Sequence, residues 1–231
     1  CPSSRARRYQ ASRPAARTAF TICSASDCGT RGSFFPCCTK RAARTASTLP
    51  SRGMRARTAR STPALTAIGE PDFEPARGDA HTADARRARG ESAPLLGLPM
   101  TLKESYNVRG LRTTCGMPFW KDFRSEHDAP VTTRVKSAGA RGMAKTNVPQ
   151  MLADWQSANP IYGRSNNPWE PSRTPGGSSG GSAAAIAAGL SAREVGSDIG
   201  GSIRVPAAFC GIYGHRPSET LLPRSGQFPM P

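Results

Sequence analysis

The alternation of apolar and polar positions changes along the chain. Residues 1–65 show no sustained period of 2 or 3.6, whereas the residues from about 83 onward alternate between apolar runs and polar stretches. Within 129–140, Val131, Val135 and Ala138 fall on one face of a helix, which predicts an amphipathic helix. Other predicted elements are the end of a helix (83–91), a strand entering a loop (95–104), a strand (140–149), a polar loop (156–177), a short helix of small residues (182–190) and a strand or turn (192–198).

Helices that alternate with short apolar segments are typical of α/β proteins. We therefore expect a mixed β-sheet core flanked by helices over residues 83–231, preceded by a transition at 66–82. The chain starts at Cys1 and stops at Pro231 inside a Gly/Pro-rich run, and both ends look cut. We expect the domain to be incomplete on its C-terminal side, with exposed apolar surface as a result.

The first quarter of the chain carries most of the charge. The formal net charge is +16, and residues 1–60 hold 13 Lys/Arg against one acid, which gives +12 and leaves +4 for the rest. Residues 1–65 are low-complexity and we expect them to be disordered. Three interpretations are open: a basic arm for a polyanion, a transit peptide, or an out-of-frame reading of a GC-rich gene. The last would leave the segment without a function.

Cysteine spacing and hydropathy exclude several classes of protein. The seven cysteines are an odd number, and the five among the first 38 residues have no ligand partners at zinc-site spacing. The sequence also has no apolar stretch of about 18 residues. We therefore expect a cytoplasmic protein without a metal, an organic cofactor or a membrane partner, while a transit peptide would change its location. The sequence predicts no oligomeric state.

Two Gly/Ser segments are the candidates for chemistry. The first, TPGGSSGGSAAA (174–185), is unlike a plain linker because it follows a Thr-Pro turn and runs into an alanine helix. It lacks the lysine of a P-loop, so its glycines are better explained by a sharp turn that places serines at a helix start. In the second segment (196–218), Gly200 and Gly201 precede Ser202, as an oxyanion hole beside a nucleophile would require.

A serine nucleophile needs a base. The three histidines, His81, His127 and His215, lack a convincing Asp partner, so a Ser-His-Asp triad stays possible but is disfavoured. Lys103 ends the apolar run LLGLPMTL and can point from the core into a pocket. Burial would favour its neutral, basic form, although most lysines lie on the surface.

LPMTLKE, TPGGSSGGSAAA and GSDIGGSIRVPAAFCGIYGHRPS together resemble the amidase signature family in order and spacing, over about residues 83–228. The resemblance implies an amide hydrolase in which Lys103 is the base, Ser178 is a relay in a cis peptide and Ser202 is the nucleophile. It further implies an oxyanion hole formed by backbone amides of Ile199, Gly200, Gly201 and Ser202. Supporting roles fall to Gly177, Ser179, Asp198 and Arg204; Ser179 is the second choice for the relay.

The sequence departs from the family pattern in places. Glu104 follows the lysine where most members have Asp, and Arg141-Gly142-Met143 replaces an apolar strand, which indicates local damage or divergence. Two alternatives to a hydrolase of small amides remain: an amidotransferase component that modifies misacylated tRNA, and an inactive truncated remnant. Ile199 and Val205 stand where the amidotransferases usually have Thr and Gln, which makes a nucleic-acid substrate the weaker hypothesis.

Overall fold

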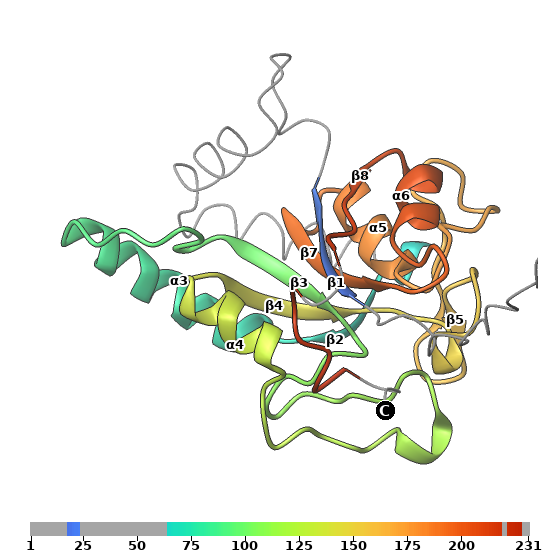
Figure 1. Cartoon of the computed structure of the whole chain (residues 1–231), viewed down its shortest axis with the longest axis horizontal. Helices are drawn as coiled ribbons and strands as arrows, with labels where there is room; N and C mark the ends of the chain where they lie inside the picture. Colours follow the sequence, from blue (N-terminus) through green and yellow to red (C-terminus); the bar gives the residue numbers. More distant parts are fainter. Residues whose placement is uncertain (1–17, 24–63, 219–220, 228–231) are drawn as a thin grey trace, which may run out of the picture.

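The computed structural model describes residues 18–23, 64–218 and 221–227 of the chain. They form a mixed α/β domain with helices on both sides of a sheet (Figure 1). The elements are, in chain order, β1 (Thr18–Cys23), β2 (Ile68–Pro71), α3 (Phe73–Ala88), β3 (Pro99–Lys103), η2 (Pro118–Trp120), α4 (Pro130–Ser137), β4 (Arg141–Thr146), η3 (Gln150–Leu152), β5 (Ala158–Asn159), β6 (Gly163–Arg164), α5 (Gly180–Ala187), β7 (Arg193–Asp198), α6 (Arg204–Cys210) and β8 (Tyr213–Gly214).

The main sheet has six strands in the order β2-β4-β3-β7-β1-β8. Strands β4, β3 and β7 are parallel, whereas β2, β1 and β8 pair antiparallel with their neighbours. Because parallel strands end at one edge of the sheet, Lys103, Thr146 and Asp198, the last residues of β3, β4 and β7, lie along that edge. In open α/β sheets this carboxyl edge is where ligands bind.

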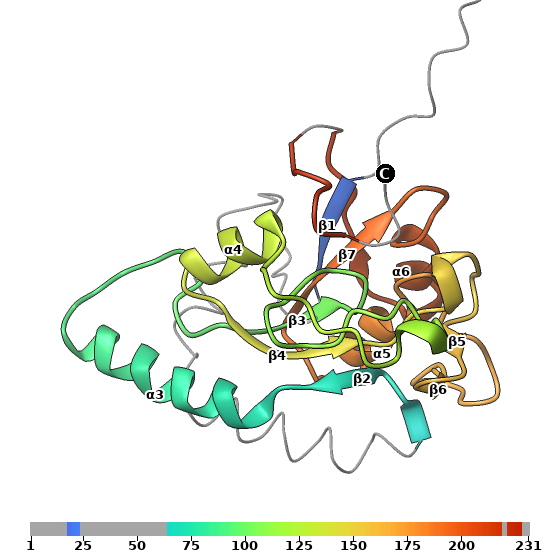
Figure 2. The ribbon, with the colours of Figure 1, turned by 90° about the horizontal axis from the view of Figure 1, so that it is seen from below.

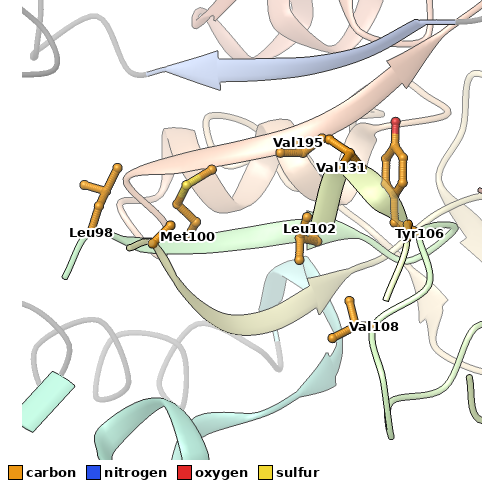
Figure 3. Close-up of a cluster of buried hydrophobic side chains, with 9 residues drawn as sticks. Leu98, Met100, Leu102, Tyr106, Val108, Val131 and Val195 are labelled. Atoms are coloured by element: carbon orange, nitrogen blue, oxygen red, sulfur yellow. The ribbon is translucent and has the colours of Figure 1, made fainter. Parts of the chain in front are cut away.

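Strand β3 is buried on both faces along its whole length. Met100 and Leu102 point into an apolar cluster that also contains Val131 of α4 (Figure 3). Side chains alternate along a strand, so Thr101 and Lys103 point to the opposite face, where their hydrogen-bonding partners lie on or next to α5 and β7. The strand thus presents one apolar and one polar buried face, and the polar face carries the candidate base.

Helix α5 lies close to the sheet because its residues are small. Every residue from Gly180 to Ile186 is buried, and Ala184 and Ala185 pack in one cluster with Ala144 of β4. A Cβ atom on Gly181 would lie 2.5 Å from the backbone of Asn147, so only glycine fits there. The predicted helix of small residues is confirmed, although it begins at residue 180.

The residues before position 83 contribute more than the sequence pattern indicates. The stretch 66–82 forms β2 and the larger part of α3, which runs from β2 along the side of the sheet (Figure 2). The buried residues of α3 are alanines, and alanines give only a weak hydrophobic pattern in the sequence: Ala76, Ala80 and Ala83. Strand β1, within the segment expected to be disordered, pairs with β7 from Thr18↔Asp198 to Cys23↔Arg193; the rest of 1–63 lies outside the described residues.

The interpretation of Arg141-Gly142-Met143 as local damage is corrected by the structure. These residues begin strand β4, which pairs with both β2 and β3. The Arg141 guanidinium lies 3.2 Å from the Asp79 carboxylate of α3, so its charge has a partner at the start of the strand. Met143 packs against Ala76 of the same helix.

The polar loop predicted at 156–177 is largely irregular, with only the two-residue strands β5 and β6. Among the described helices, none combines the length and the apolar character that crossing a bilayer requires.

Candidate active site

Lys103 is fully buried at the carboxyl end of β3. Its Nζ atom donates to Ser178 Oγ at 2.6 Å, to Ser197 Oγ at 3.0 Å and to the Ser197 carbonyl oxygen at 3.5 Å. These oxygens replace the water that a buried amine loses. The lysine therefore has its proton-carrying atom directly beside a serine hydroxyl.

Ser178 lies in the turn before α5, and the Gly177–Ser178 peptide bond is cis. Glycine is required at 177 because a Cβ atom there would lie 2.5 Å from the Asp154 carbonyl oxygen. The neighbouring Ser179 has a different environment, since its Oγ donates to the Ser197 carbonyl at 3.3 Å. Of the two serines, Ser178 is the one whose hydroxyl is hydrogen-bonded to the lysine.

Ser202 lies in the turn between β7 and α6 and is 8% exposed. Its carbonyl oxygen accepts a hydrogen bond from the Ser179 amide at 3.1 Å, which joins the two Gly/Ser segments. The turn needs Gly201, whose φ is +109°, a conformation that side chains disfavour. Ile199 and Gly200 are exposed at the tip of the turn.

Asp198 holds this turn in shape. Its fully buried carboxylate accepts hydrogen bonds from the amides of Gly201 (2.9 Å), Ile203 (3.0 Å) and Arg204 (3.2 Å). The Arg204 guanidinium adds two more, at 2.9 and 3.1 Å. Burial raises the pKa of Asp198, but these hydrogen bonds, led by that of the Arg204 side chain, outweigh burial and lower the pKa to about 2.

One predicted oxyanion donor is engaged elsewhere. The Gly201 N–H donates to Asp198 Oδ1, so this amide points into the turn and not toward a substrate. Ile199 and Gly200, two of the other predicted donors, lie in the exposed part of the same turn.

Glu104 organises the loop that follows β3. Its buried carboxylate accepts from the amides of Thr114 (2.6 Å) and Cys115 (2.9 Å) and from the Tyr162 hydroxyl (3.1 Å). Glu104 therefore holds the backbone of this loop in place, and none of these hydrogen bonds goes to Ser178 or Ser202.

Sequence analysis missed Ser197. This residue, 4% exposed on β7, offers both its hydroxyl and its carbonyl to Lys103. The only signal in the sequence is a polar residue inside the segment 192–198. The three histidines are exposed, on α3 and in surface loops. Among the described residues, no group of three His, Cys, Asp or Glu side chains could hold a metal ion.

At the carboxyl edge of the parallel strands of this mixed sheet, a buried lysine contacts a buried serine, and a Gly-Gly-Ser turn lies beside them. The family model described as Amidase matches residues 52–231. The chain belongs to this amidase family.

Two characterised relatives and one solved structure illustrate the similarity. Human fatty-acid amide hydrolase 2 is 40% identical over 176 residues, which cover 73% of this chain and 33% of that protein. One component of the Chromohalobacter salexigens glutamyl-tRNA(Gln) amidotransferase is 46% identical over 153 residues (66% and 32%). Native peptide amidase from Stenotrophomonas maltophilia superposes with a TM-score of 0.76 at 31% identity, covering 82% of this chain and 41% of that one. The chain spans about a third of the length of the two relatives.

Proposed function

We propose that this chain carries the catalytic part of a serine amidohydrolase that cleaves a carboxylic amide C–N bond. The observation that carries the proposal is the 2.6 Å hydrogen bond between the buried Lys103 amine and Ser178, next to the turn that holds Ser202. Membership of the amidase family supports it, as does the similarity to a fatty-acid amide hydrolase and a peptide amidase. The substrate class is a small-molecule amide.

In the proposed reaction, Ser202 Oγ attacks the carbonyl carbon of the amide and forms an acyl-enzyme. The hydroxyl proton passes to Ser178, whose own proton moves to the Lys103 amine, and the same route returns a proton to the departing amine. Water then attacks the acyl-enzyme, with the proton relay acting again. Charge on the carbonyl oxygen is received by the amides of Ile199, Gly200 and Ser202. No step requires a metal or an organic cofactor.

A second candidate is a component of an amidotransferase, because one of the relatives reported above is of that kind, at 46% identity. In that case the ammonia that leaves as the acyl-enzyme forms on Ser202 would pass to a partner protein, and water would then hydrolyse the acyl-enzyme. The Ile199 and Val205 departures weigh against it. Steady hydrolysis of simple amides without any added protein would separate the hydrolase from the amidotransferase.

Covalent labelling tests the site directly. The chain is incubated with a serine-reactive fluorophosphonate, and the modified peptide is identified by mass spectrometry. We expect the label on Ser202, none in Ser202→Ala, and strongly slowed labelling in Lys103→Ala, because Ser202 then loses its route for the proton. His127→Ala and His215→Ala are matched controls and should be labelled like the parent. A label on another serine, or a requirement for either histidine in a folded variant, would overturn the proposal.

A further inference from the structure

A buried carboxyl also lies on the polar face of the sheet and has no part in the proposed reaction. Glu194 on β7 is fully buried. Its Oε1 accepts from Thr146 Oγ1 at 2.8 Å and from Ser182 Oγ at 3.1 Å, and Thr101 Oγ1 binds Oε2. These three partners are neutral hydroxyls, unlike the arginine that accompanies Asp198. Burying a carboxyl costs free energy because the group loses its water, unless hydrogen bonds or a nearby charge compensate.

The positions of the three hydroxyls connect Glu194 to the lysine. Thr101 precedes Lys103 by two residues on β3, so both side chains lie on the same face of the strand. Thr146 is the residue that pairs with Lys103 across the β3–β4 ladder. Glu194 is therefore bound to the lysine's own strand and to the strand beside it.

The third hydroxyl connects Glu194 to the relay serine. Ser182 lies on α5, one helical turn after Ser178. The segment 178–182 is thus bound at its first residue by Lys103 and at its last by Glu194. The carboxyl and the amine hold the same short segment from two adjacent strands.

The two groups are also coupled through their charges. Burial raises the pKa of Glu194 to about 8, while the hydrogen bonds from the three hydroxyls and the positive charge of Lys103 act in the opposite direction. Such an interaction is reciprocal, so an ionised Glu194 favours the ammonium form of the lysine and a neutral Glu194 favours the free amine.

Other titratable side chains lie on the elements that surround Glu194. Helix α5 contributes none. The remaining groups are Tyr106, which donates to the Gly196 carbonyl, Glu104, bound to the Thr114 and Cys115 amides, Cys115 itself, which is buried beside Glu104, Lys145, bound to Thr113, Asp198, bound to Arg204, Arg141 at the start of β4, paired with Asp79, and Arg193 at the start of β7. Glu194 is the carboxyl of this set that has only hydroxyl partners and is bound to the strands around Lys103.

We propose that Glu194 is a positioning residue for the Lys103–Ser178 pair, and that its charge controls how readily Lys103 accepts a proton. The inference rests on the proposed function, in which the proton of Ser202 reaches Lys103 through Ser178. An ionised Glu194 stabilises the ammonium that forms when the proton reaches Lys103, whereas a neutral Glu194 leaves the free amine favoured.

The test follows the ionisation of Lys103 directly. The full chain is labelled with ¹³C at the lysine Cε atoms and titrated by NMR, with the Lys103 signal assigned by its loss in Lys103→Ala. In Glu194→Gln we expect the midpoint of the Lys103 titration to fall by about one pH unit, since a nearby opposite charge is removed. Ser182→Ala should lower it by less, because it weakens only one bond that favours the carboxylate. Glu70→Gln, a buried carboxyl on β2 paired with Arg112, is the control and should leave the midpoint unchanged.

An unchanged Lys103 midpoint in folded Glu194→Gln overturns the inference. If that variant does not fold, Ser182→Ala decides the question in the same way. In the enzyme, the alkaline rise of kcat/KM should move to lower pH together with the NMR midpoint, whereas a merely structural residue would lower the rate equally at every pH. Absence of amide hydrolysis in the parent would count against the proposed function, and the NMR titration would still decide whether Glu194 and Lys103 are coupled.

Discussion

The Nζ atom of Lys103 lies 2.6 Å from Oγ of Ser178, although the two residues are 75 positions apart in the sequence. The contact exists because β3 ends at the carboxyl edge of the sheet just where the turn into α5 crosses it. Both side chains are buried. The contact between the lysine and the serine is therefore shielded from solvent.

The first prediction concerns the proposed transfer of a proton from Ser202 through Ser178 to Lys103. In a full-length protein that carries this sequence, Ser202→Ala should lower kcat/KM for a simple carboxylic amide by roughly 10⁴-fold or more, because the nucleophile is lost. Lys103→Ala should be nearly as damaging, and Ser178→Ala less so if water replaces the relay hydroxyl. The rate of the parent should rise toward alkaline pH as the lysine loses its proton. A profile that levels off above about pH 6.5, where histidine titrates, would contradict a lysine base.

Ser197 and Ser179 should differ in their effects. Ser197 Oγ contacts the Lys103 amine, whereas Ser179 Oγ is bonded to the backbone of β7. We expect Ser197→Ala to lower kcat about tenfold, since the lysine loses one of its oxygen partners, and to change the pH dependence of kcat. Ser179→Ala should chiefly lower the free energy of unfolding. Equal effects of the two substitutions on the pH profile would argue against a role of Ser197 at the lysine.

Asp198 should make the stability of the fold sensitive to acid. Its pKa in the folded protein is about 2, below the ordinary value of 3.8. A carboxyl with a lowered pKa contributes stability that is fully present above about pH 4 and is lost as the pH falls toward 2. Asp198→Asn should therefore lower the free energy of unfolding at neutral pH and flatten its decline between pH 4 and 2. Denaturant unfolding at several pH values measures this, with the exposed Asp122→Asn as the control.

The Gly-Gly pair before Ser202 offers a matched comparison. Gly201 has a φ of +109°, and a Cβ atom there would lie 3.0 Å from Val205 Cγ2, whereas a Cβ on Gly200 would meet nothing within 4 Å. Gly201→Ala should cost about 1–3 kcal/mol in the free energy of unfolding and distort the nucleophile turn. Gly200→Ala keeps the backbone amide and should be tolerated. Thermal unfolding and fluorophosphonate labelling of both variants check this, and equal stability of the two would contradict the strain at 201.

Glu194 should make the fold less stable as the pH rises, whereas Asp198 should make it less stable as the pH falls. Its pKa is raised from 4.5 to about 8 in the folded protein. Stability from such a group is present below about pH 4.5 and is lost progressively as the pH rises through 8. Glu194→Gln, which cannot ionise, should therefore lose less stability than the parent between pH 5 and 9. If the two proteins decline in parallel over this range, Glu194 is not the group responsible.

The sequence by itself determined those elements whose residue types are distinctive, such as runs of small residues, apolar residues or glycines. The small residues at 182–190 predict a helix, which the structure places at Gly180–Ala187, and the apolar run at 95–104 predicts a strand entering a loop, which the structure places at Pro99–Lys103. The Gly-Gly before Ser202 predicts backbone amides without side chains beside a hydroxyl. These are local properties, and a local pattern is sufficient to predict them.

Only the tertiary structure decided which distant groups meet. Ser197 and Glu194 are ordinary polar residues in the sequence, and their roles come from the register of β7 against β3 and from the position of α5. The tertiary structure also brings strand β1, which is distant in the sequence, beside β7. Hydrogen bonds between strands depend on backbone groups that every residue has, so no pattern of side chains predicts which strands pair or which buried polar groups come together.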